Sequence, residues 1–180
     1  LLEAMVDAVA KTPDAKRVVA TTIHHAGNLQ RCEENVAKLN LQKHVVVTDP
    51  QPLDCVRNYL KACDVAVVPR PKAPGFPIKV LNILAAKKPC VMFASSSGGL
   101  EHRKNAYLVP EDTPEDLAAA LIEVLEDRDL QVDLGEAGFE YALNNRDRSV
   151  TAERVSAAYM RTLENSRRKR HLKQRPRIGC

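Results

Sequence analysis

Two short glycine-containing segments have the composition of a phosphate-binding site. Gly75 precedes Phe76 and Pro77, and a proline at this position suits the first turn of a helix that runs to about residue 86. A glycine here lets the backbone approach a phosphate without a Cβ in the way, and a helix N-terminus adds free N–H groups and the positive end of the helix dipole. Gly98 and Gly99 follow the next expected strand. Spacing alone fits equally well with glycines that only form tight turns.

Basic side chains near these glycines are candidates for binding the same anion. Lys79 lies one turn into the expected helix, and Arg70 and Lys72 belong to the loop before it. Each could contact phosphate or could be an ordinary solvated base. His24 and His25 are adjacent in an earlier loop and could reach phosphate or an acceptor, although paired loop histidines are more often simply exposed. The sequence shows no paired carboxylates, metal-binding cluster or nucleophile–base arrangement, so no residue is assigned a catalytic role.

An alternation of short apolar strands with helices of about ten residues must position these candidates. Nearly continuous apolar strands separated by helices are typical of a parallel sheet covered on both faces. The sequence therefore predicts an α/β fold with a doubly wound, Rossmann-like parallel sheet, followed by C-terminal helices. Such sheets bind ligands at the carboxyl edge of the strands, where the loops that carry Gly75 and Gly98 would lie. Strands are expected at 17–22, 44–48, 64–69, 89–94 and 106–110, and the C-terminal helices at about 114–125, 130–144 and 149–163.

The charge of the chain is concentrated at one end. The net charge is +4, but seven bases lie within residues 167–177, and removing them from the 27 basic residues leaves 20 against 23 acids. A mildly acidic body, together with 4% aromatic residues and no Trp, argues against nucleic acid as a partner. We expect one domain over 1–165 and a disordered basic tail over 166–180. The tail is either merely solvated or docks on an anionic membrane surface.

The cysteine pattern points to a reducing compartment. Five cysteines without a C-x-x-C pair indicate free thiols rather than a disulfide framework or a zinc site. We therefore expect a cytoplasmic protein. No apolar run approaches the roughly 18–20 residues of a transmembrane helix. Because the chain opens inside a helical pattern without an initiator Met, we expect a piece of a longer protein.

An ordered series of motifs between residues 64 and 110 carries a family resemblance. It resembles the donor-binding, C-terminal half of retaining glycosyltransferases with the GT-B fold, particularly glycosyltransferase family four (glycosyl transferases group 1). The resemblance covers roughly residues 1–164. The matching residues are Asp64 and Pro69 around a strand, Gly75-Phe76-Pro77, Leu81, Ala85, Ala86 and Pro89, then Gly98-Gly99, Glu101, Asn105 and Leu108-Val109-Pro110.

The resemblance implies a hexosyltransferase that uses a UDP- or GDP-sugar as donor and needs no cofactor or metal. A glycan or lipid-linked acceptor, as in polysaccharide biosynthesis, would be held largely by a missing N-terminal domain, so this fragment alone would be inactive. Work on such acceptors would place the enzyme peripherally on the inner face of the membrane. The implied nucleotide-sugar contacts are Gly75, Phe76, Pro77, Lys79, Asn82, Gly98 and Gly99, with His24, His25 and Arg70 as further phosphate or acceptor contacts.

Two departures from the family pattern leave alternatives open. The family pairs two carboxylates eight positions apart, and this chain has Pro74 and Asn82 there. Proline has no side-chain acceptor for the hydroxyls of a sugar, and a neutral amide is a weaker acceptor than a carboxylate. A catalytically degenerate domain that serves as a binding or scaffold module is therefore the alternative. A GT-B-fold sugar-nucleotide epimerase fits less well, because the acidic and histidine catalytic residues of that class are not evident.

Overall fold

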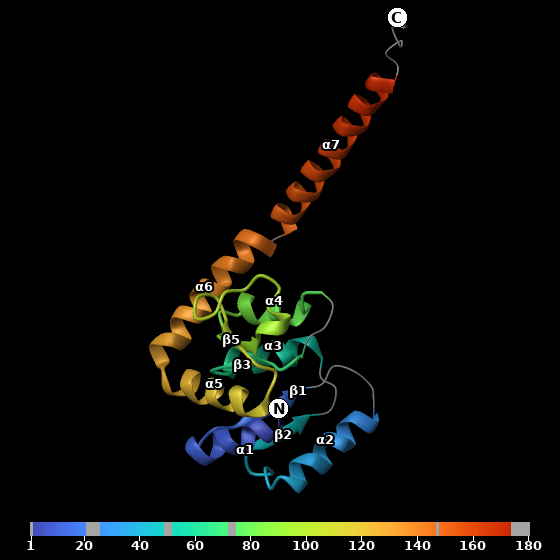
Figure 1. The fold of residues 1–180 in the computed structure, drawn as a ribbon. Coiled ribbons are helices and arrows are strands. Elements are labelled where there is room, and N and C mark those ends of the chain that lie inside the picture. The colour runs from blue at the N-terminus through green and yellow to red at the C-terminus, as the bar shows by residue number, and fades with distance from the viewer. Residues whose placement is uncertain (1, 21–25, 49–51, 72–74, 147, 174–180) are drawn as a thin grey trace, which may run out of the picture. The chain divides into compact units, whose positions relative to one another are not determined.

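Strands and helices alternate along the chain in the computed structural model, which describes residues 2–20, 26–48, 52–71, 75–146 and 148–173 (Figure 1). The α/β class predicted from the sequence is confirmed. The elements are α1 (Leu2–Lys11), β1 (Arg17–Ala20), α2 (Ala26–Lys38), β2 (Val45–Thr48), α3 (Leu53–Ala62), β3 (Ala66–Val68), α4 (Ile78–Ala85), β4 (Cys90–Phe93), the 3₁₀ turn η1 (Ala94–Ser96), β5 (Tyr107–Val109), α5 (Pro114–Glu126), α6 (Arg128–Arg146) and α7 (Arg148–Lys173).

All the described strand pairs are parallel. β1 pairs with β2, with Arg17 opposite Val45. β4 lies between β3 and β5, with Val91 opposite both Val67 and Tyr107. The described strands thus form one sheet of two strands and one of three, where the sequence predicts a single sheet. Parallel pairing with intervening helices is as predicted, and it puts the carboxyl ends of β3, β4 and β5 at one edge.

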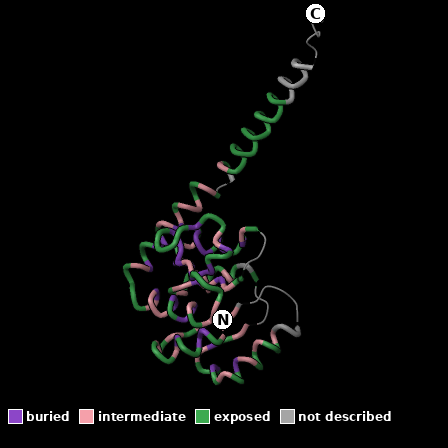
Figure 2. Tube along the Cα trace, in the orientation of Figure 1, coloured by how far each residue is buried: buried purple, intermediate pink, exposed green. Residues whose placement is uncertain are grey.

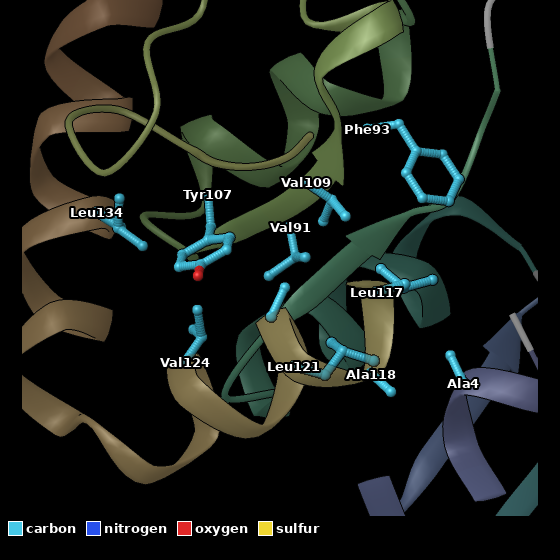
Figure 3. Close-up of a cluster of buried hydrophobic side chains, with 11 residues drawn as sticks. Ala4, Val91, Phe93, Tyr107, Val109, Leu117, Ala118, Leu121, Val124 and Leu134 are labelled. Atoms are coloured by element: carbon cyan, nitrogen blue, oxygen red, sulfur yellow. The ribbon is translucent and has the colours of Figure 1, made fainter. Parts of the chain in front are cut away.

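The main hydrophobic core lies between the three-stranded sheet and α5 (Figure 3). All four residues of the central strand β4 are buried, as expected for a strand with neighbours on both sides. Val91 and Val109 of the sheet belong to one cluster with Leu121 and Val124 of α5, and Ala4 of α1 joins it. A second cluster packs α1 against β2 and α2 through Met5, Val36, Leu41 and Val45.

The helix α5 begins as its sequence predicts. The side chain of Thr113 accepts a hydrogen bond from the backbone N–H of Asp116 at 3.2 Å, and Pro114 occupies the first turn. The hydroxyl–amide bond satisfies one of the amide groups that a helix start leaves without an intrahelical partner. This cap holds α5 at the point where the chain leaves β5.

The chain divides into two compact units. One comprises residues 1–140 and the other residues 141–180. In α7, residues 151–165 are all exposed (Figure 2). The helix also continues through Lys173, where disorder is expected from residue 166. Residues 166–173 contain Arg, Lys and Leu but neither Gly nor Pro, so their helix propensity is high.

No helix among the described residues combines the length and the apolar character needed to cross a bilayer.

Candidate functional site

The loops that follow β3 and β4 meet at the carboxyl edge of the three-stranded sheet. The Ser96 hydroxyl, in η1 directly after β4, donates a hydrogen bond to the backbone carbonyl of Arg70 at 2.9 Å. A few residues further along each loop, the ring of Phe76 lies against Gly98. A Cβ built on Gly98 would be only 2.4 Å from Phe76 Cδ2. The structure therefore brings together the two glycine segments that the sequence singles out.

Three glycines at this edge adopt backbone conformations that L-residues rarely take. The φ angles are +83° at Gly75, +58° at Gly98 and +99° at Gly99. A Cβ on Gly75 would meet no atom within 4 Å among the residues that the structure describes, and its positive φ is the backbone angle that favours glycine. All three glycines are exposed. Their backbone is consequently accessible to a ligand at the sheet edge.

The N-terminus of α4 opens directly beside Gly75. Pro77 is buried at the N-cap position and makes no side-chain hydrogen bond to the first turn. The Val80 N–H donates to the Pro77 carbonyl at 2.9 Å, so the N–H groups of Ile78 and Lys79 are the ones at this helix start that can donate to an anion. Lys79 and Asn82 lie three residues apart on the exposed side of α4, while Val80, Ile83 and Leu84 form its buried side. The predicted contacts on α4 therefore face solvent.

A third loop, after β5, also reaches this edge. The hydroxyl of Ser95 donates to the Asp112 carboxylate, with distances of 2.8 and 2.9 Å to its two oxygens. This contact links the loop after β4 to the loop after β5. Three successive strand exits are thus joined by side-chain contacts.

Most of the residues predicted for the site lie along this one edge, but not all can be placed. Arg70 contributes its carbonyl to the contact with Ser96, and its side chain is exposed. His24, His25 and Pro74 lie outside the described residues. Ser95, Ser96 and Asp112 were not predicted as site residues. A run of three serines before Gly98-Gly99 was a signal for a turn, but a sequence does not reveal the partners of its hydroxyls. The residues placed at the edge are Arg70, Gly75, Phe76, Pro77, Lys79, Asn82, Gly98 and Gly99.

Two of the described cysteines have thiols with a raised pKa. Burial raises the pKa of Cys90 to about 12, so this thiol stays protonated near neutral pH. The pKa of Cys63 is also raised, chiefly by burial. Among the described residues, no three His, Cys, Asp or Glu side chains are grouped to hold a metal ion. The polar groups placed at the site are backbone amides, a helix terminus and the exposed side chains of Arg70, Lys79 and Asn82.

A separate surface groove of about 670 Å³ lies within the second unit. None of the residues predicted for the site lines it. The lining residues are Arg146, Thr151, Ala152, Val155, Ser156 and Tyr159.

Comparison with known proteins gives one family match, which is described as glycosyl transferases group 1 and covers residues 1–127. An uncharacterized glycosyltransferase of Methanocaldococcus jannaschii is 28% identical over 120 residues, which is 64% of this chain and 33% of that protein. The chain thus matches about a third of the length of this relative.

Solved structures share the fold at low sequence identity. The C-terminal domain of the group 1 glycosyl transferase LpcC from Francisella tularensis has a TM-score of 0.68 and 19% identity, covering 82% of this chain and 80% of that one. Alr3699/HepE of Anabaena in complex with UDP has a TM-score of 0.74 and 16% identity, covering 87% of this chain and 44% of that one. At these identities the likeness establishes the GT-B fold alone.

Proposed function

The chain belongs to the glycosyl transferases group 1, and on this premise we propose that it is the donor-binding half of a retaining glycosyltransferase. The donor is a nucleoside diphosphate sugar, and a UDP- or GDP-sugar fits best. The observation that carries the proposal is the meeting of two glycine loops at the N-terminus of α4, where Phe76 packs on Gly98. The sugar is transferred to a glycan or to a lipid-linked acceptor.

Backbone groups account for binding of the diphosphate. Gly75 at φ +83° and Gly98-Gly99 at positive φ come from neighbouring strand exits, so their amides border one stretch of the sheet edge. A diphosphate has two charged groups that can accept from two such sets of N–H donors. The dipole of α4 adds positive potential at its first turn. UDP bound to a protein of the same fold, Alr3699/HepE, supports this choice of ligand class.

Exposed side chains supply the remaining contacts to the nucleotide sugar. Lys79, in the first turn of α4, supplies a mobile positive charge for the phosphates, and Arg70 supplies a second one. Asn82 offers a carbonyl acceptor to the ribose hydroxyls from the next turn of α4. Gly75, Phe76 and Pro77 position the phosphates against the helix start. His24 and His25 remain further candidates for phosphate or acceptor contacts.

The acceptor is held by a partner domain of the same protein. The match to the archaeal relative spans 33% of its length, and the match to Alr3699/HepE spans 44%. We infer that an N-terminal domain covers this edge of the sheet and binds the acceptor, and that this half alone does not catalyse transfer. The enzyme works in the cytoplasm, with the basic residues of 167–177 as a contact for an anionic membrane surface.

A catalytically degenerate binding module is the second candidate, and one sequence feature favours it. Pro74 and Asn82 replace the two motif carboxylates that the family resemblance implies. In the full-length protein, Pro74→Glu distinguishes the two functions. A gain of donor turnover from no detectable level would identify a degenerate module, whereas turnover in the unaltered protein would show that the carboxylate at position 74 is not required.

A thermal-shift panel on this chain tests the donor site. The ligands are UDP, GDP, ADP, their monophosphates and the matching sugar conjugates. A ligand at 100 times its Kd adds about 2.7 kcal/mol of stability, which for a chain of this size raises Tm by several degrees. We expect one diphosphate to raise Tm more than its monophosphate. A panel without any shift would count against the donor site and favour the binding module.

A further inference from the structure

We propose that Ser96 is the positioning residue of the diphosphate site, because its hydroxyl fixes the loop that carries Gly75 relative to the loop that carries Gly98 and Gly99. The inference rests on the proposed donor function and adds a residue to it. Ser96 is 5% exposed and ends η1, which follows directly from the fully buried strand β4. It is therefore attached directly to the most fully buried strand of the three-stranded sheet.

The hydroxyl makes a contact between loops rather than within the core. Its shorter hydrogen bond runs to the carbonyl of Arg70 at 2.9 Å, and a longer one runs to the carbonyl of Phe93 at 3.3 Å. A hydroxyl has one proton to donate, so the shorter bond across to Arg70 is the stronger of the two. Arg70 lies just beyond β3, and its N–H donates to Val68 at 2.8 Å. Ser96 thus joins the exits of two neighbouring strands.

One short stretch of chain after β4 contacts both Arg70 and Phe76. The Ser96 hydroxyl bonds to the Arg70 carbonyl, and Gly98, two residues later, lies against the ring of Phe76. Phe76 is the neighbour of Gly75 and lies directly before the start of α4. Because Ser96 ties this stretch to the exit of β3, it positions Gly98-Gly99, and through Phe76 the Gly75 backbone, at the sheet edge.

A diphosphate is more sensitive to this arrangement than a monophosphate. The two phosphate groups of a diphosphate contact amides of both loops. Displacement of one loop therefore breaks the contacts of one phosphate group while the other stays bound. A nucleoside monophosphate engages one set only. Loss of the Ser96 anchor should consequently lower selectivity for the diphosphate, an effect that mere destabilisation of the fold does not produce.

The test is calorimetric titration of the 180-residue chain and its variants with UDP and UMP, with GDP and GMP alongside. We expect Ser96→Ala to weaken the binding of the preferred diphosphate about tenfold and that of its monophosphate less than threefold. Gly98→Ala, which forces the Phe76 ring to move, should also lower the affinity for the diphosphate relative to that for the monophosphate. The matched control is Thr12→Val, because the Thr12 hydroxyl donates to the Ala8 carbonyl at 2.6 Å at the end of α1 and removing it leaves the site intact. The ratio of its affinities for the diphosphate and the monophosphate should equal that of the unaltered chain.

Hydrogen–deuterium exchange without ligand separates this inference from the proposed function. Ser96→Ala should speed exchange in peptides that cover Gly75 to Ile78, and Thr12→Val should not. An equal loss of affinity for both nucleotides, or unchanged exchange at Gly75 to Ile78, would overturn the positioning role. If the unaltered chain binds none of the diphosphates, the donor function fails and the selectivity role fails with it, while the exchange result still reports whether Ser96 holds the loop.

Discussion

Glycines serve different purposes at the sheet edge and where α6 packs against α4 and the residues just after it. At the edge, Gly75 has φ +83° and open space around its missing Cβ. In α6, Gly135 and Gly138 are buried helical residues three positions apart, so they share one face of the helix. A Cβ on Gly135 would be 2.4 Å from the backbone oxygen of Lys87, just after α4, and one on Gly138 would be 2.8 Å from Leu84 Cδ2.

The difference separates a glycine required for close packing from one required for its backbone angle. At Gly135, the missing side chain lets α6 approach the main chain of Lys87, so a substitution there presses directly on a backbone oxygen. At the edge, a Cβ on Gly75 would meet no atom within 4 Å among the described residues, and the positive φ is what favours glycine there. Under the proposed function, the open side of Gly75 is where a ligand approaches its backbone.

Substitution of Gly135 by Ala should have the largest effect on stability. Helix propensity alone predicts a gain of about 1 kcal/mol for Gly→Ala. The 2.4 Å approach to the Lys87 oxygen opposes this gain, and we expect a net loss of about 1–3 kcal/mol. Urea denaturation measures the free energy of unfolding. Gly138→Ala should cost less, because its nearest contact, at 2.8 Å, is the end of the Leu84 side chain and the nearest backbone oxygen, that of Asn105, lies at 3.0 Å rather than 2.4 Å. A Gly135→Ala chain as stable as the unaltered one would refute the close packing.

Substitution of Gly75 by Ala should act mainly on binding. The positive φ costs about 1–2 kcal/mol of stability in a residue with a Cβ, and the added methyl group blocks the approach of a phosphate. We expect UDP or GDP affinity to fall at least tenfold in titrations. Asn40→Ala is the matched control, since Asn40 has φ +56° in a turn after α2. It should lose stability without losing nucleotide affinity, and a similar loss of affinity in both variants would remove Gly75 from the site.

Local sequence signals predicted the elements well because those signals act over a few residues. The α5 start at Thr113-Pro114 and the apolar strand at Cys90–Phe93 both follow from capping and hydrophobic patterning. The position of Gly75 between a strand and a helix also identified the sheet edge. These features depend on neighbours along the chain, which a sequence shows directly.

Contacts between distant residues could not be predicted in the same way. The bond from Ser96 to Arg70 spans 26 positions, and Gly135 meets Lys87 across 48. Nothing in the composition of a serine-rich turn indicates which carbonyl its hydroxyl reaches.

The smallest expected effect concerns the pH dependence of stability at the junction of β5 and α5. The Tyr107 hydroxyl donates to the Glu123 carboxylate, Arg103 forms an ion pair with it, and the two together lower the pKa of Glu123. A lowered carboxyl pKa favours the folded state above the ordinary glutamate value of about 4.3, and this stabilisation is lost as the pH falls through the lowered pKa.

Tyr107→Phe removes the larger of these causes. At pH 7 the variant should be less stable by under about 1 kcal/mol, because the Glu123 side chain is 42% exposed and water screens its interactions. The difference from the unaltered chain should narrow as the pH falls below the ordinary glutamate value and through the lowered pKa of Glu123. Urea denaturation at pH 7 and at a series of acidic pH values measures this difference. Nucleotide affinity should stay unchanged, because the tyrosine begins β5 at the end opposite to the strand exits. A change in affinity would show that packing behind the sheet and binding at its edge are coupled.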